Sequence, residues 1–142
     1  PKIIYPGLMR ISKSNKNDFP RFFYDHNFGY SFTNDTYFIV GEKLKYLMAL
    51  LNSKLCRFIF PFYIYSFDNN GYKVFTEYLE QIPCVLAKHN VEHDIEKLVD
   101  EILLKKKSSS DTIEIENEID KKIFNLYNLT EEEISYIKDN IK

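Results

Sequence analysis

The spacing of apolar residues changes near residue 41, and this change constrains the fold more than any other feature of the sequence. Before it, short aromatic and β-branched runs alternate with Pro, Gly, Asn and Asp, as expected for strands joined by turns. These runs cover residues 3–5, 8–11, 22–24 and 37–40. After it, Leu44, Leu47, Met48 and Leu51 have the spacing of an amphipathic helix. The sequence therefore predicts an α/β (α+β) fold with a small mixed sheet and packed helices.

A second helix is predicted over residues 55–65, where nearly every residue is apolar. An element of this kind packs on several sides and forms the core of a domain. Ser53 is placed to cap it, since a serine side chain accepts a hydrogen bond from a free backbone N–H of the first turn. Pro61 is expected to kink or end this helix, because it lacks a backbone donor and clashes with the preceding turn.

From residue 90 onward the pattern is helical. Apolar stripes predict a helix over residues 91–107, capped by Asn90, and another over 112–127 after a polar linker at 108–111. Thr130 and Glu133 have the spacing of a capping box and predict a third helix over 131–141. These features predict a C-terminal helical hairpin. They divide the chain into an α/β domain at residues 1–87 and a helical region at 88–142.

Charge is distributed unevenly along the chain. The net charge is −2, yet residues 1–60 contain nine Lys or Arg against four Asp or Glu, which leaves +5 in this part and −7 in residues 61–142. A basic front half joined to an acidic back half is expected where only the front half approaches phosphates. Uneven surface charge without a ligand is the alternative.

Two polar connections interrupt the apolar runs. Residues 12–18 form a partly basic stretch without apolar side chains, so they have no reason to be buried. Residues 66–73 contain Asn70-Gly71, a pair that adopts positive φ in tight hairpin turns. We expect the second connection to form a protruding hairpin.

Several functions are not supported by the sequence. Cys56 and Cys84 have no CxxC spacing, and Cys84 with His89 and His93 lacks a fourth ligand for zinc, so no metal site is predicted. The longest apolar stretch, at residues 55–67, is too short to span a membrane, which favours a cytoplasmic protein. Asp120-Lys121-Lys122 resembles part of a nuclease site but is better explained as a solvated helix face. The aromatic residues of the apolar helix are assigned to the core rather than to base stacking.

Six blocks in this order carry a family resemblance: PKIIY at 1–5, RIS at 10–12, FYD at 23–25, DTYFI at 35–39, YLMALLNSKL at 46–55 and YLEQIP at 78–83. The sequence resembles the TaqI-like C-terminal specificity domain, the target recognition domain of bacterial type IIG restriction-modification enzymes and related adenine-specific DNA methyltransferases. Residues 95–107 and 119–130 also resemble the helices that end such chains. The resemblance implies a domain that binds double-stranded DNA and directs an upstream adenine-N6 methyltransferase, with or without a fused restriction endonuclease, to its target.

The same resemblance implies that this chain is not itself an enzyme. The Asn/Asp-Pro-Pro-Tyr/Phe motif that grips a flipped adenine is absent, as is a Gly-rich methyl-donor loop. The chain begins at Pro1 without an initiator Met, so we expect a longer parent protein. S-adenosylmethionine, and magnesium if the parent also cleaves DNA, are implied for that parent, whereas this chain is expected to need no cofactor.

If the resemblance holds, the two polar connections contact the DNA. The first supplies donors and acceptors that suit phosphates and base edges: Arg10, Ser12, Lys13, Asn15, Lys16 and Arg21. The second supplies a further group: Asn69, Asn70, Tyr72 and Lys73. The alternatives are a solvated loop for the first and a plain β-turn for the second. A different function is a protein-interaction module that packs on a partner subunit through its acidic C-terminal helices.

Overall fold

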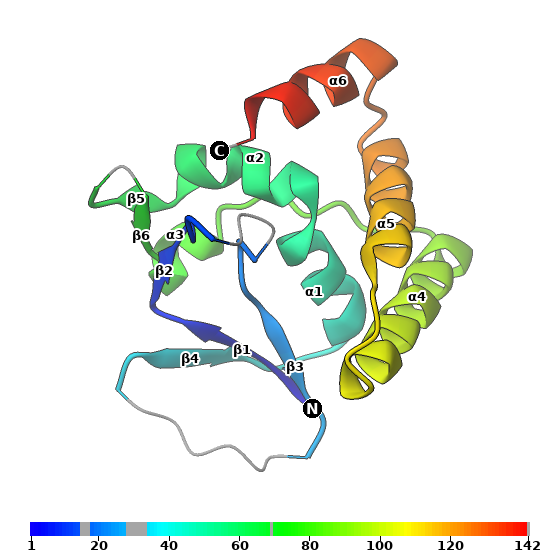
Figure 1. Cartoon of the computed structure of the whole chain (residues 1–142), viewed down its shortest axis with the longest axis horizontal. Helices are drawn as coiled ribbons and strands as arrows, with labels where there is room; N and C mark the ends of the chain where they lie inside the picture. Colours follow the sequence, from blue (N-terminus) through cyan, green and yellow to red (C-terminus); the bar gives the residue numbers. More distant parts are fainter. Residues whose placement is uncertain (15–17, 28–33, 69, 142) are drawn as a thin grey trace.

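The computed structural model describes residues 1–14, 18–27, 34–68 and 70–141. Its first sheet has β1 (Lys2–Pro6) in the middle, between β3 (Phe23–Asp25) and β4 (Thr36–Ile39), and both pairings are antiparallel. Ile3 and Tyr5 alternate with Ile4 along β1 and are buried on the inner face. This inner face packs against the helices (Figure 1).

The second sheet joins β2 (Leu8–Arg10) to β6 (Gly71–Lys73) and β6 to β5 (Tyr65–Ser66). The predicted α+β class is confirmed, but the strands of the described residues form two antiparallel sheets rather than one small mixed sheet. The chain bends at Gly7, whose N–H donates to Asp35 O at 2.8 Å and whose carbonyl accepts from Val74 N at the same distance. A side chain here would run into the Tyr37 ring. Because of this bend, β1 and β2 pair with different partners.

Two consecutive helices, α1 (Leu44–Asn52) and α2 (Lys54–Tyr63), lie between the strands and the C-terminal helices (Figure 1). The predicted cap of the second helix is confirmed, since Ser53 Oγ accepts from Cys56 N at 3.1 Å and donates to Leu50 O at 2.7 Å. Pro61 lies inside α2, which ends two residues later at Tyr63. Leu44 and Leu51 are buried, as the amphipathic spacing predicts, whereas Leu47 is only partly buried.

After the short α3 (Thr76–Leu79), the chain continues into α4 (His89–Lys107), α5 (Ile113–Leu126) and α6 (Glu131–Asn140). Asn90 is not the cap of α4: the cap position is Lys88, and Asn90 lies in the first turn. The extended segment before α4 is anchored at Val85, whose carbonyl accepts from Tyr46 Oη and whose N–H donates to Tyr127 Oη. Helical structure begins at His89, two residues earlier than the sequence indicated. The capping box of Thr130 and Glu133 is present.

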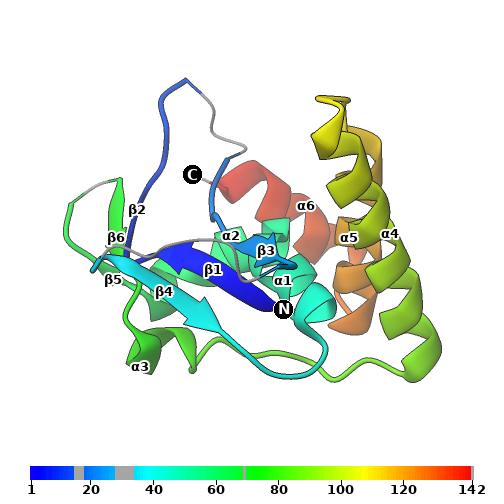
Figure 2. The ribbon, with the colours of Figure 1, turned by 90° about the horizontal axis from the view of Figure 1, so that it is seen from below.

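The C-terminal helices pack on α1 and α2 and share one apolar core with the sheets. Figure 2 shows α4, α5 and α6 together on one side of the molecule. Three lysines from the basic front half contact acids of α4 and α5. The ion pairs are Lys43–Glu92 at 2.7 Å, Lys45–Asp100 at 2.7 Å and Lys54–Asp120 at 3.2 Å. Part of the charge asymmetry therefore holds the two halves of the chain together.

Asp120 is buried and is not part of a solvated face as the sequence suggested. One carboxylate oxygen accepts from the backbone N–H of Lys54 at 2.9 Å, in the first turn of α2, where an anion is favoured. The other lies 3.2 Å from Lys54 Nζ. Asp120 is thus a structural residue that joins α5 to α2.

Replacing Asp120 with alanine is expected to lower the free energy of unfolding by about 1–3 kcal/mol, because the Lys54 N–H loses its acceptor. Burial raises the pKa of Asp120 above its ordinary value of 3.8. The carboxyl group of Asp120 therefore contributes fully to stability below pH 3.8, and this contribution is lost as the pH rises from 3.8 through the higher pKa of the folded state.

The variant Asp120→Asn cannot ionise at this position. Over the same rise in pH, denaturant unfolding should therefore show that Asp120→Asn gains stability relative to wild type. A constant difference between the two proteins would contradict the assignment.

Candidate nucleic-acid interface

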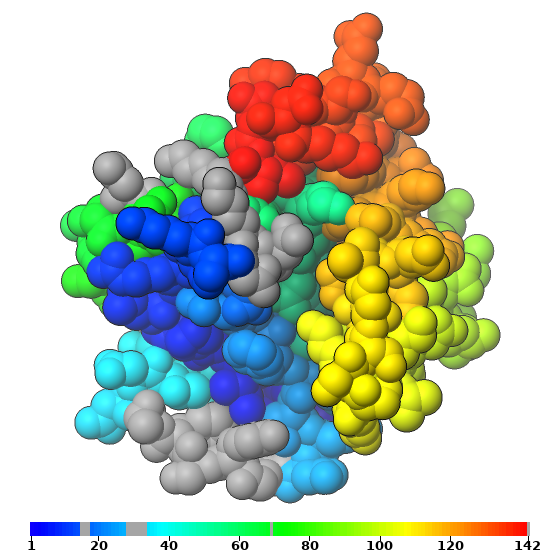
Figure 3. Space-filling view, in the orientation of Figure 1, coloured from blue at the N-terminus to red at the C-terminus, as the bar shows by residue number. Residues whose placement is uncertain are grey.

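The two polar connections lie side by side. Here the first connection means the described residues 11–14 and 18–22, and the hairpin means the described residues 65–68 and 70–73. Pairing of β2 with β6 places Arg10 opposite Gly71, and the backbone continues this ladder with Ile11 N donating to Asn70 O at 2.9 Å. In Figure 3 the first connection (blue) adjoins the hairpin (green) on one face. Two segments that are some fifty residues apart therefore form one surface.

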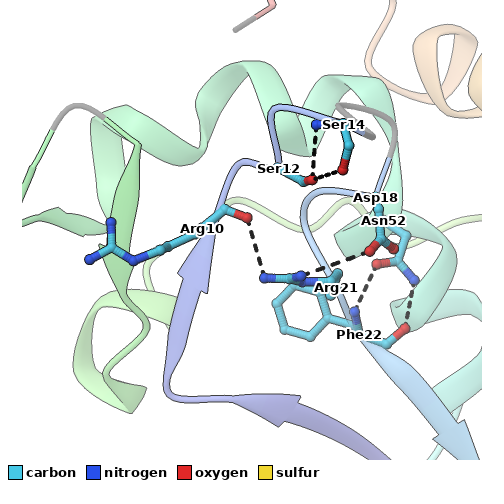
Figure 4. A network of polar contacts seen from close by, with 7 residues as sticks. All are labelled: Arg10, Ser12, Ser14, Asp18, Arg21, Phe22 and Asn52. Atoms are coloured by element: carbon cyan, nitrogen blue, oxygen red, sulfur yellow. Dashed lines mark hydrogen bonds and ion pairs between the residues drawn. The ribbon is translucent and has the colours of Figure 1, made fainter.

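The first connection is fixed at its far end by apolar and polar anchors. Phe19 is only 3% exposed and packs edge to face on Phe60, with ring centroids 5.2 Å apart. The side-chain amide of Asn52 accepts from Phe22 N at 3.0 Å and donates to Phe22 O at 2.9 Å (Figure 4). Neither anchor was predicted from the sequence, although Phe19 directly follows the polar stretch.

Arg21 holds the first connection together from inside. Its guanidinium donates to Arg10 O at 3.3 Å and lies 3.8 Å from Asp18 Oδ2 (Figure 4). Its side chain is 27% exposed, so only part of the guanidinium faces solvent. Ser12 accepts from the Ser14 backbone at 3.3 Å and closes a local turn. Arg21 and Ser12 therefore have structural contacts as well as partial access to a ligand.

The hairpin is organised around Asp68. Its Oδ1 accepts from Asn70 N at 2.9 Å, and its Oδ2 accepts from Arg10 NH1 at 2.7 Å. These two contacts, the backbone one first, hold the pKa of Asp68 below its ordinary value of 3.8, so the carboxylate is charged at neutral pH. The turn closes with Phe67 N donating to Gly71 O at 3.2 Å.

The predicted hairpin is confirmed, but the predicted backbone geometry is wrong at Gly71. Gly71 does not have positive φ; among the described residues that conformation is found at Gly41, Lys43, Ser109 and Asn128. Asp68 helps to bend the chain, because its side-chain Oδ1 accepts a hydrogen bond from the backbone N–H two residues on. Gly71 serves a steric purpose, because a side chain there would collide with the Phe67 ring.

The ten predicted contact residues fall into four groups. Those exposed on the shared surface are Arg10, Lys13, Asn70 and Lys73, while Ser12 and Arg21 are partly exposed. Asn15, Lys16 and Asn69 lie outside the described residues. The prediction that Tyr72 contacts DNA is not supported, because Tyr72 is buried. It is 1% exposed and packs on Phe19 and Phe60, with ring centroids 5.4 and 5.5 Å away. Alternation along β6 turns Tyr72 into the core and its neighbour Lys73 outward.

A cationic and aromatic cluster lies on the outer face of the second sheet. Arg10 Cζ is 4.7 Å from the Phe67 ring centroid, and Lys73 Nζ is 5.9 Å from the same centroid. Tyr65 is 50% exposed and is the registered partner of Lys73. The sequence analysis did not identify Phe67 or Asp68, because their relevance depends on a strand pairing between distant segments.

The comparison with known families decides what this surface belongs to. The profile of the TaqI-like C-terminal specificity domain matches residues 1–84. The chain belongs to this family. The match covers both sheets, α1, α2 and α3, so the whole shared surface lies inside the specificity domain. The helices α4, α5 and α6, for which the sequence analysis also noted a resemblance, lie outside the matched residues.

Membership indicates the function of the domain as a whole. Specificity domains of this family provide sequence-specific DNA recognition in restriction-modification enzymes. No curated protein and no solved structure matches the chain. Within the described residues, no cluster of His, Cys, Asp and Glu side chains has an arrangement that could hold a metal ion. None of the helices described here has both the length and the apolar character needed to cross a bilayer.

Proposed function

We propose that this specificity domain selects the DNA sequence at which an adenine-N6 methyltransferase in the same polypeptide acts. The observation that carries the proposal is the single surface built by the first connection and the hairpin, which contains exposed Lys13 and Lys73 within the family-matched residues. Ammonium groups on exposed loops bind phosphates, whereas arginine and asparagine side chains can read base edges. In many proteins the residues that recognise a ligand lie on surface loops that a rigid scaffold holds in position.

In this function the domain contributes binding energy and register, not chemistry. Its sequence has neither a Gly-rich methyl-donor loop nor an Asn/Asp-Pro-Pro-Tyr/Phe motif, so we assign no S-adenosylmethionine site to these residues. Methyl transfer, and any DNA cleavage with its magnesium, would belong to other parts of the parent enzyme. Within this domain, Arg10, Lys13, Asn70 and Lys73 are the leading contact residues, with Ser12 and Arg21 in support.

The test replaces Lys13 and Lys73 with alanine in the full-length protein. We expect DNA affinity to fall. The negative slope of log affinity against log salt concentration should become shallower by about 1.8, because each lost phosphate contact removes about 0.9 from its magnitude. Arg21 is left intact because its side chain donates a hydrogen bond to Arg10 O. Replacing it could weaken DNA binding by disturbing the structure rather than by removing a DNA contact. The readouts are a binding titration at several salt concentrations and the sites of N6-methyladenine after incubation with the methyl donor.

The matched control replaces Lys88 and Lys97, which are also exposed. Lys88 caps α4 and Lys97 lies in its first half, a segment that Figure 2 shows well apart from the first connection. This control should leave affinity and salt dependence unchanged. Equal behaviour of the two double variants would rule out the shared surface as the DNA contact and favour a protein-interaction role for the domain.

A further inference from the structure

Arg10 is a basic residue of the shared surface whose guanidinium is held both by a carboxylate and by an aromatic ring. It is the last residue of β2, and NH1 donates to Asp68 Oδ2 at 2.7 Å. The ring of Phe67 lies beneath the group, with 4.7 Å between Cζ and the ring centroid. The Arg10 side chain is nevertheless 53% exposed. Its orientation is therefore fixed while part of the group faces solvent.

The two oxygens of Asp68 explain how the guanidinium is fixed. Oδ1 is occupied by the backbone N–H of Asn70, which sets the orientation of the carboxylate within the turn. Oδ2 is then directed at Arg10 NH1. Phe67 is itself held over Gly71, where no side chain could fit. The hairpin thus supplies both an anionic partner and an aromatic platform at fixed places for one arginine on another strand.

This arrangement suits a base edge better than a phosphate. A carboxylate 2.7 Å from the guanidinium offsets its charge and repels a nearby phosphate. It repels the uncharged edge of a base much less, because the acceptors there carry only partial charges. A guanidinium has five N–H donors in a fixed plane, so with one bound to Asp68 it still has donors for two acceptors. Guanine presents two such acceptors, O6 and N7, in the major groove.

We propose that Arg10 reads a guanine in the target through O6 and N7, and that Asp68 and Phe67 are positioning residues that hold its guanidinium for this contact. The inference rests on the proposed function, since it assigns one base contact within that surface. Holding the side chain in advance reduces the conformational freedom lost on binding. Lys13 and Lys73 would then provide affinity, whereas Arg10 would provide selectivity at one position.

The experiment uses the full-length protein and the DNA site it selects from a randomised duplex library. Each guanine of that site is replaced in turn by 7-deazaguanine, which lacks the N7 acceptor. For the wild type, we expect one replacement to weaken binding by about 10-fold, within the discrimination that a bidentate base contact provides. Asp68→Asn should lose most of this discrimination. Arg10→Lys, which keeps the charge but lacks the planar fork, should lose it as well.

Asp68→Asn is a sharp test because its oxygen can still accept from Asn70 N while its amide group no longer accepts from Arg10. Thermal unfolding should match wild type, and affinity for unrelated duplex should stay equal or increase as a negative charge is removed. A selected site without guanine would overturn the proposal. So would a 7-deazaguanine effect that persists in both variants. If Lys13 and Lys73 still prove necessary for DNA affinity in that case, the proposed function stands and only the Arg10 assignment fails.

Discussion

Replacing Phe60 with alanine is expected to destabilise the protein by about 3–5 kcal/mol, the usual cost of removing a buried phenyl ring from a packed core. Phe60 is fully buried, and its ring packs edge to face against Phe19 and Tyr72. These three rings come from α2, from the end of the first connection and from β6. They join the base of the shared surface to the helical core, so the substitution should also weaken DNA binding.

Phe62 is the matched control for this prediction. It lies two residues further along α2 and is 74% exposed. Phe62→Ala should change stability by no more than about 0.5 kcal/mol, as is usual for surface substitutions. Denaturant unfolding followed by circular dichroism measures both variants. Similar losses at the two positions would show that α2 is not oriented as described here.

Removing residues 88–142 is expected to abolish cooperative folding of what remains. The deletion takes away the packing partners of α1 and α2 and the three acids that pair with lysines of the front half. Buried apolar side chains lost with it are Ile95, Val99, Ile115, Ile119, Ile123, Phe124 and Ile137. Each such side chain contributes about 1.5–3 kcal/mol, whereas whole domains are stable by only about 5–15 kcal/mol.

A shorter deletion separates the contribution of the last helix. Removing residues 130–142 takes away α6, in which Ile137 is the buried apolar residue, and leaves α4 and α5 in place. This variant should still unfold cooperatively, at a lower denaturant concentration.

A cooperative transition for residues 1–87 alone would contradict the prediction made for the longer deletion. It would also show that the boundary predicted at residue 87 divides two folding units.

The elements that could be predicted from the sequence are those determined by local spacing. Strand runs, the stripe from Leu44 to Leu51, the cap at Ser53 and the capping box at Thr130 each depend on residues within one or two turns. The family resemblance added the expected partner, double-stranded DNA. The start of α4 was predicted two residues late, because the expected cap at Asn90 lies inside the first turn and Lys88, which has no side-chain cap hydrogen bond, gives no local signal.

The arrangement of the candidate site could be predicted only in part. Alternation shows that Tyr72 and Lys73 face opposite ways, but which of them is buried depends on the partner strand and the helix beneath. The Arg10–Asp68 pair joins residues 58 positions apart, so no local pattern indicates it. The division into two sheets depends on the bend at Gly7, whose need for glycine arises from the distant Tyr37 ring.

The fixing of both ends of the first connection has a consequence for how specificity can evolve. One end continues the β2–β6 ladder, and the other is held by Asn52 at Phe22 and by Phe19 in the core. Between such anchors, doubling the length of a flexible segment costs only about 0.6 kcal/mol in closure entropy. Under the proposed function, insertions and exchanges there would alter which DNA site is chosen without disturbing the scaffold, so new targets would arise by local sequence drift alone.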